Sequence, residues 1–164
     1  MEKGSCAFMF NYTYEALAAL EKSLVFDSFS RANAATLGAL LDEEAKKNGY
    51  PVAFEIVING LVVFRYFQDG CPAESNNWLM RKRRVIESQQ MSSLRFGKLL
   101  ELRGQTLEDN LMNPQEYAPG GGGMPIILRG TGVIGSVCVS GCPDHLRDQD
   151  IVVKAMLRLL DYKS

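Results

Sequence analysis

The sequence predicts an α+β fold, a two-layer sandwich in which helices pack on a central antiparallel sheet of about five strands. Two hairpin patterns, around residues 59–60 and 130–132, supply pairs of antiparallel strands. Helical patterns precede, separate and follow these hairpins. The chain shows no alternation of strand, helix and strand, which is the order that builds a parallel sheet.

Length and composition indicate one globular domain over residues 1–164, with a helical segment at 12–48 packed on it. The chain is 46% hydrophobic and 23% charged with a net charge of -1, which excludes a disordered, collagenous or coiled-coil protein. The balanced charge gives no general attraction to nucleic acid or to an anionic membrane. Residues 1–11 lack the apolar core of a signal peptide, and no run is long enough to span a membrane, so we expect a cytoplasmic protein.

The first third of the chain predicts two helices and a hairpin. The helices cover about 13–24 and the segment after Ser30, which ends at residues 48–49. The strands VAFEIVI and LVVFRYF flank an Asn-Gly turn, and a regular register would pair Ile56 with Val63. Both faces of this hairpin are largely apolar. We therefore expect helices to cover one face and another subunit to cover the other.

The middle of the chain predicts a helix that starts near Trp78, capped by Asn76 or Asn77, and breaks near Ser92 and Ser93. Residues 94–103 fit either a helix or a strand. A capping box at 106–109 and a turn at 113–114 follow.

The last third predicts a glycine loop, a hairpin and a helix. The loop covers 120–123, and the strands cover 126–128 and 133–141. Gly135 inside the second strand indicates a bulge or a close backbone approach. The amphipathic helix begins at about Asp148.

The four cysteines, Cys6, Cys71, Cys138 and Cys142, are predicted to be free thiols in a reducing compartment. An extended CVSGC strand separates the Cα atoms of its two cysteines by roughly 13 Å, too far for one ion or one disulfide. His145, the only histidine, joins Cys142 only if the loop curls back. We therefore predict no metal site.

Two segments suggest binding chemistry. The four glycines lack the Gly-Lys-Ser/Thr ending of a phosphate loop and precede a strand, so we expect positive φ or close approach to a ligand or subunit. The basic run at 81–84 spreads around its helix at about 100° per residue. Arg81 and Lys82 would face a cleft and bind an anion, with Arg83 and Arg84 solvated. The alternative is a solvated face or subunit salt bridges. His145 with Cys142 or Ser140 is a possible catalytic pair, but a plain loop histidine is favoured.

Several stretches together, NNWLMRKRRV, Ser92-Ser93, EYAPGGGGMPI, GVIGSVCVSG and DQDIVVKAM, resemble the haem-degrading-domain-like (GlcG/HbpS-like) superfamily. The resemblance covers about residues 26–160 and points to the branch of small cytosolic single-domain proteins with yeast and bacterial members. It implies a profilin- or PAS-like sandwich, a higher homo-oligomer, and a cleft at a subunit boundary. The positions that it assigns to this cleft are Asn77, Trp78, Arg81, Lys82, Ser92, Ser93, Gly121, Gly122, Pro125, Ser140 and Gly141.

The chain departs from that branch at Asp148-Gln149, where Asp-His is usual before the last helix, and at Cys142, where leucine is usual. The lost histidine argues against inherited catalysis, unless His145 replaces it.

We therefore expect an oligomeric protein that binds an anionic small molecule through Arg81, Lys82 and the backbone N–H groups of the glycine loop. The candidates are a tetrapyrrole, a corrinoid or an organic acid, so haem or a corrinoid is the possible cofactor. One alternative is an assembly or adaptor protein without catalysis, and another is an enzyme acting on haem or a corrinoid. The expected partners are copies of the chain itself, with no nucleic acid and no membrane.

Overall fold

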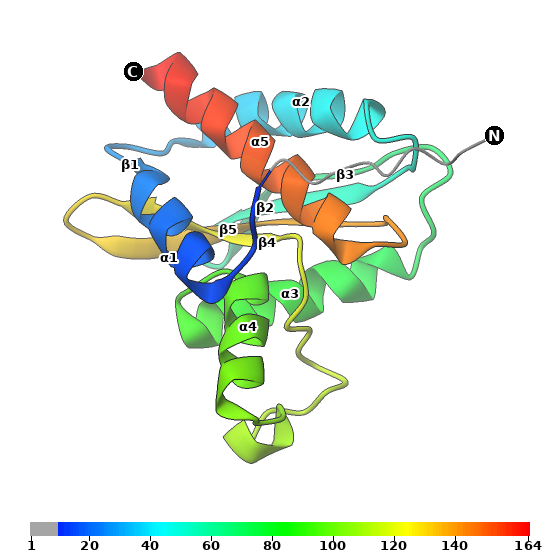
Figure 1. The fold of residues 1–164 in the computed structure, drawn as a ribbon. Coiled ribbons are helices and arrows are strands. Elements are labelled where there is room, and N and C mark those ends of the chain that lie inside the picture. The colour runs from blue at the N-terminus through cyan, green and yellow to red at the C-terminus, as the bar shows by residue number, and fades with distance from the viewer. Residues whose placement is uncertain (1–9) are drawn as a thin grey trace.

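The computed structural model describes residues 10–164, so Cys6 and most of the segment inspected for a signal peptide lie outside the described residues. Within that range, helices and strands alternate irregularly along the chain (Figure 1). In order, they are α1 Tyr14–Ser23, β1 Val25–Phe26, α2 Arg31–Lys46, β2 Ala53–Ile58, β3 Leu61–Phe67, α3 Ser75–Gln89, α4 Ser93–Arg103, a 3₁₀ turn Glu108–Asn110, β4 Gly123–Leu128, β5 Gly132–Ser140 and α5 His145–Lys163.

The strands form one open sheet in the order β1-β4-β5-β2-β3. This confirms the predicted α+β class and the five strands. The sheet is mixed, however, because β1 pairs with β4 in parallel, with Val25 opposite Ile127. The sequence prediction missed β1 since a strand of two residues is too short to show an alternating pattern.

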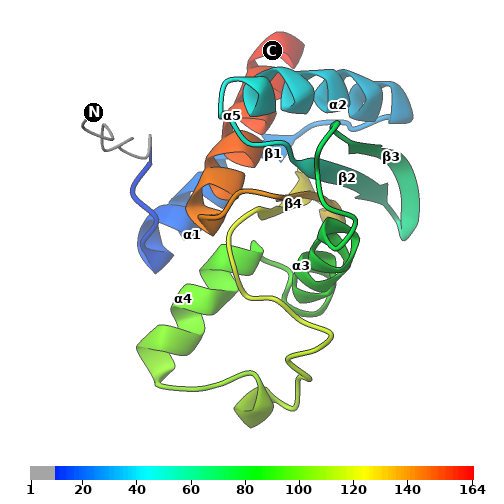
Figure 2. The same cartoon turned by 90° about the vertical axis from the view of Figure 1, so that its right-hand side faces the viewer.

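Helices of this chain cover both faces of the sheet (Figures 1 and 2). Phe54 and Ile56 of β2 belong to the main core, which they share with residues of α2 and α5. Ala53 of β2 packs on the other face with Leu79 and Ile86 of α3. At β2, helix α3 of the same chain therefore covers the face that was expected to meet another subunit.

The β2–β3 hairpin turns at Asn59-Gly60 as predicted, but its register shifts by one residue between Ile56 and Val57. Ile56 lies opposite Phe64, where the regular register placed Val63, and Glu55 lies opposite Arg65. The bulge gives Glu55, which is buried, a cross-strand ion pair of 3.1 Å to Arg65 Nε. A buried carboxylate requires such a partner, and the regular register would have left it facing a phenylalanine.

Helix starts follow capping residues, with two corrections. Ser30 caps α2 in a capping box, and Ser92 caps α4, so residues 94–103 are helical. Helix α3 begins at Ser75, before both predicted asparagine caps. Helix α5 begins at His145 behind the N-cap Asp144, three residues before the predicted start at Asp148.

The second hairpin, β4–β5, confirms the prediction for Gly135. A β-carbon on Gly135 would lie 1.9 Å from the carbonyl oxygen of Val57 on the neighbouring strand. The β4–β5 register also shifts between Ile126 and Ile127. Gly123 belongs to β4 and not to the preceding loop. No helix within residues 10–164 is long and apolar enough to cross a membrane.

Candidate functional site

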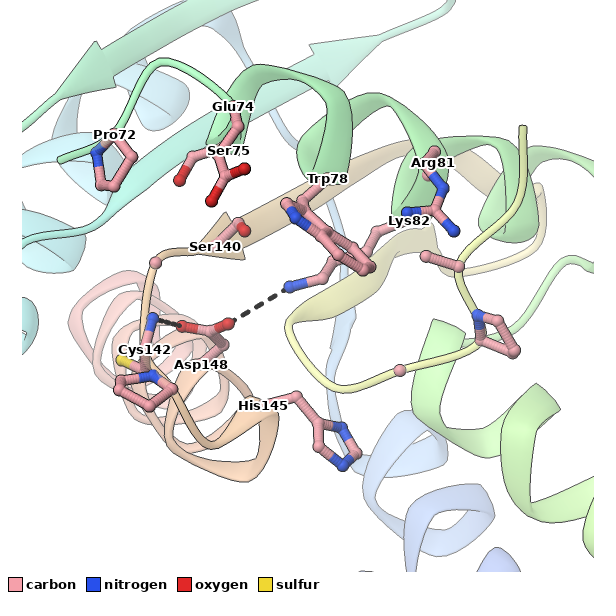
Figure 3. Close-up of a pocket in the computed structure, with 15 residues that line it drawn as sticks. Pro72, Glu74, Ser75, Trp78, Arg81, Lys82, Ser140, Cys142, His145 and Asp148 are labelled. Atoms are coloured by element: carbon pink, nitrogen blue, oxygen red, sulfur yellow. Dashed lines mark hydrogen bonds and ion pairs between the residues drawn. The ribbon is translucent and has the colours of Figure 1, made fainter. Parts of the chain in front are cut away.

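A pocket of about 590 Å³ opens where the first half of α3, the loop before β4 and the β5–α5 junction meet (Figure 3). Apolar groups form much of its rim, and charged groups lie at its floor. It is lined by Pro72, Glu74, Ser75, Trp78, Arg81, Lys82, Ala118, Pro119, Gly120, Ser140, Gly141, Cys142, Pro143, His145 and Asp148.

The floor of the pocket holds a buried ion pair between Lys82 of α3 and Asp148 of α5, each at most 3% exposed (Figure 3). Lys82 Nζ donates to the carbonyl oxygen of Val139 at 2.7 Å and lies 3.3 Å from Asp148 Oδ2. Asp148 Oδ1 accepts the backbone N–H of Cys142 at 3.1 Å. The pair thus joins α3, the end of β5 and α5 at a single point.

One wall of the pocket is the stack of Arg81 on Trp78. The guanidinium lies 4.3 Å from the centroid of the indole, which is 42% exposed. Arg81 Nη2 donates to the carbonyl oxygen of Pro114 at 2.6 Å, which connects α3 to the loop before β4. Its Nε is buried and has no partner within the described residues. Arg81 therefore fixes the wall and keeps donor capacity beside the pocket.

The glycine loop beside the pocket is held by side chains of this chain. The N–H of Gly121 donates to His145 Nδ1 at 2.7 Å, and that of Gly122 donates to Gln149 Oε1 at 2.8 Å. These backbone donors are thus already used, which corrects the expectation that they receive an anion. The predicted positive φ is confirmed at Gly122, where it is +115°.

The structure brings together only part of the predicted site. Trp78, Arg81, Lys82, Ser140 and Gly141 line the pocket, and Gly121 and Gly122 lie in the loop beside it.

The remaining predicted positions lie outside the pocket. Asn77 lines an adjacent hollow of about 540 Å³. Ser92 caps α4 and donates to Glu21, while Ser93 donates to the carbonyl oxygen of Gly120 and supports the loop. Pro125 is buried in β4.

The basic run diverges around α3 as predicted, but its last two members are not free in solvent. Arg83 pairs with Glu55 at 3.4 Å and with Glu87 at 3.1 Å. Arg84 Nη1 donates to the carbonyl oxygen of Glu116 at 3.3 Å. Both serve the fold, which leaves Arg81 and Lys82 as the cations of the pocket.

Sequence reasoning missed Asp148 and Ser75 as pocket residues. Ser75 precedes the predicted start of its helix, and Asp148 lies 66 positions from its partner Lys82. The sequence drew attention to Asp148 in one way only, because it precedes Gln149, the residue that departs from the family pattern. In the structure, Gln149 accepts the N–H of Gly122 and so holds the glycine loop.

The three described cysteines are free thiols. Burial raises the pKa of Cys138, which lies in β5, to about 12. Burial, followed by the nearby Asp148 carboxylate, raises the pKa of Cys142, so both thiols are protonated at neutral pH. Within residues 10–164, no group of three His, Cys, Asp or Glu side chains is arranged to hold a metal ion.

The fold and pocket define the class: an open α+β sandwich whose pocket lies between α3 and the β5–α5 junction. The chain belongs to the haem degrading protein HbpS-like family, whose model matches residues 29–157. The predicted resemblance is therefore confirmed.

Relatives match over most of the chain. A UPF0303 protein of Rhizobium etli is 38% identical over 144 residues, covering 88% of this chain and 87% of the relative. A UPF0303 protein of Streptomyces coelicolor is 36% identical over 149 residues, covering 90% and 94%.

Solved structures share the fold. Ybr137w matches with a TM-score of 0.84 at 24% identity, covering 94% of this chain and 91% of that one. The PduOC:heme complex matches with a TM-score of 0.67 at 20% identity, covering 79% and 94%. A double mutant of HbpS from Streptomyces reticuli matches with a TM-score of 0.65 at 21% identity, covering 79% and 86%.

Proposed function

We propose that this protein binds an anionic small molecule with an apolar body in the pocket above Lys82 and Asp148. The observation that carries the proposal is the position of Lys82, a buried ammonium on the floor of an open pocket. Two of its protons are directed to Val139 and Asp148, and the third has no acceptor within residues 10–164. A ligand carboxylate is a suitable acceptor, because charge-assisted hydrogen bonds are among the stronger ones.

The rim of the pocket supports an apolar ligand body. Trp78 presents a half-exposed indole, and proline rings line three sides. Buried Arg81 Nε has no partner and lies beside this surface. A flat or apolar ligand with an acidic end fits these features, as tetrapyrroles, corrinoids and aromatic organic acids do.

The same geometry does not fit ligation of haem iron by His145. Its Nδ1 accepts the N–H of Gly121, so a neutral ring carries its proton on Nε2. Binding iron through Nε2 would move the proton to Nδ1, directly against that N–H. The thiol of Cys142 is protonated and accepts from Asn48. The proposal therefore uses the acidic groups of a tetrapyrrole and no chemistry at iron.

We further propose that the protein is a single cytoplasmic domain that assembles with copies of itself. The edge strand β3 exposes Leu61, Val62 and Tyr66, each more than 40% accessible. An apolar edge strand with unpaired backbone groups is suited to pair with another chain. Free thiols agree with a reducing compartment.

The test is a titration of Trp78, the only tryptophan, by fluorescence and of the whole protein by calorimetry. The probes are haem, cobyrinic acid and terephthalate. At least one should bind, and Arg81→Ala should weaken that binding by about tenfold or more, the value of one charge-assisted hydrogen bond. Arg103→Ala, at the exposed end of α4, is the matched control and should bind normally. If no probe gives heat or a fluorescence change, the proposed function is wrong.

A further inference from the structure

The surroundings of the Lys82 amine differ from those of a lysine amine that only stabilises the fold. It lies in a pocket that opens to solvent, and its ion-pair partner Asp148 is fixed from the other side by the N–H of Cys142. Gly122 packs closely against the amine on one side, because a β-carbon there would lie 2.8 Å from Nζ, so a ligand can reach Nζ only from the pocket that Lys82 lines. The amine thus combines burial, an adjacent base and a position in the lining of the pocket. These are the requirements of a lysine that reacts with a carbonyl group.

We propose that Lys82 forms an imine with an aldehyde or ketone that carries a carboxylate on an apolar body. This inference deepens the proposed function, since it rests on the same pocket and names the reactive group of the ligand. The carbonyl carbon would lie against Nζ, and the carboxylate would lie beside the guanidinium of Arg81, which also lines the pocket.

The chemistry balances with the residues present. Asp148 Oδ2, 3.3 Å from Nζ, takes one proton from the ammonium and leaves a neutral amine. The nitrogen lone pair attacks the carbonyl carbon as the C=O π bond breaks, and one proton passes from the attacking nitrogen to the resulting oxyanion to give a carbinolamine. The carboxylic acid of Asp148 then protonates that hydroxyl, which leaves as water when the C=N bond forms. The product is a protonated imine beside the Asp148 carboxylate. The proton stays on the imine nitrogen or passes to this carboxylate. No oxidant or reductant is consumed.

Other nucleophiles are poor competitors in this pocket. The Cys142 thiol is half-buried and kept protonated beside Asp148. The other lysines within residues 10–164 lie outside the pocket, and the side chains of Lys46 and Lys47 are 71% and 69% exposed. Such lysines react with aldehydes only as they do in any solvated protein, so they serve as internal references.

The experiment uses 4-carboxybenzaldehyde as the probe and cyanoborohydride as the named reductant, which adds hydride to the imine and fixes the adduct. Peptide mapping then gives the labelling rate of every lysine. Lys82 should be labelled at least about tenfold faster than any exposed lysine, because the pocket raises the local concentration of the aldehyde. Excess terephthalate, which has the same shape without an aldehyde, should suppress labelling at Lys82 alone.

Two variants test the roles of the amine and of its neighbouring carboxylate. Lys82→Arg retains a cation for Asp148 but has no amine, so the adduct at this position should disappear. Asp148→Asn should slow labelling of Lys82, and Lys46→Arg should leave it unchanged. Site-resolved mapping of the wild-type protein decides the question even if a variant fails to fold.

Labelling confined to exposed lysines would overturn the imine. If terephthalate binds at Trp78 in that case, the proposed function stands and only the inference fails. If neither terephthalate nor any other probe binds and Lys82 is unlabelled, both are wrong.

Discussion

Gly122 and Lys82 approach so closely that a β-carbon on Gly122 would lie 2.8 Å from Lys82 Nζ. The same β-carbon would lie 2.3 Å from the carbonyl oxygen of Val139, which accepts a hydrogen bond from Nζ. The glycine loop therefore shapes the floor of the pocket, and does so through the absence of a side chain.

Gly122→Ala should destabilise the protein by about 2 to 5 kcal/mol, the sum of a positive φ and a backbone clash. Chemical denaturation measures this change. Gly120→Ala, two residues earlier, is the matched control, because its β-carbon would make only ordinary contacts with the His145 ring, at 3.5 Å or more. Equal stabilities of the two variants would show that the loop can move away from Lys82.

Removing one member of the Lys82–Asp148 pair should cost far more than removing both. Lys82→Met leaves a buried carboxylate, and Asp148→Leu leaves a buried ammonium, so each single change should cost about 3 to 5 kcal/mol. The double variant should lose much less stability than the sum of the two single losses. A double-mutant cycle by urea unfolding measures this difference.

The exposed pair Asp27–Arg129, with side chains 84% and 70% accessible, gives the matched cycle. Its coupling should stay within about 1 kcal/mol, since solvent screens surface pairs. A similarly small coupling at Lys82–Asp148 would mean that water reaches the floor of the pocket freely.

Local chemistry made much of the fold predictable. The Asn59-Gly60 turn and the caps Ser30 and Ser92 act within a few residues, so the sequence displays them directly. The bulge between Ile56 and Val57 was not predictable from alternation. It depends on a buried ion pair whose partners come from both strands of the hairpin and from α3.

The candidate site was likewise predictable only in part. Arg81 and Lys82 were identified because they stand together in a basic run. Asp148 was identified only from the structure, in which α3 and α5 meet at the end of β5. The glycine loop was expected to offer its N–H groups to a ligand. Two side chains of α5, His145 and Gln149, occupy two of them instead. Such long-range partners leave no local pattern.

Glu21 should make stability depend on pH. This buried carboxyl of α1 has a raised pKa, chiefly from burial, which outweighs the attraction of Arg95 and the hydrogen bonds from Ser92. The folded chain therefore binds the proton more tightly than the unfolded chain. The stabilisation is full below the ordinary pKa of 4.5 and is lost as pH rises through the folded value.

Glu21→Gln removes this titration. Relative to the wild type, the variant should gain stability as pH rises above 4.5, measured by denaturation across that range. The amide oxygen still accepts from Ser92, so the cap of α4 is retained. A stability difference that stays constant with pH would contradict the raised pKa.

The edge strand β3 provides the test of self-assembly. Val62 is 41% exposed beside the 50% exposed Leu61, on a strand with a neighbour on one side only. If copies pair here, Val62→Glu places a charge in the interface and should shift the protein to a smaller species in light scattering. Leu111→Glu is the matched control, because Leu111 is 97% exposed in a loop away from β3. An unchanged mass in both variants would show that the interface lies elsewhere than at β3. A wild-type monomer at micromolar concentration would refute self-assembly.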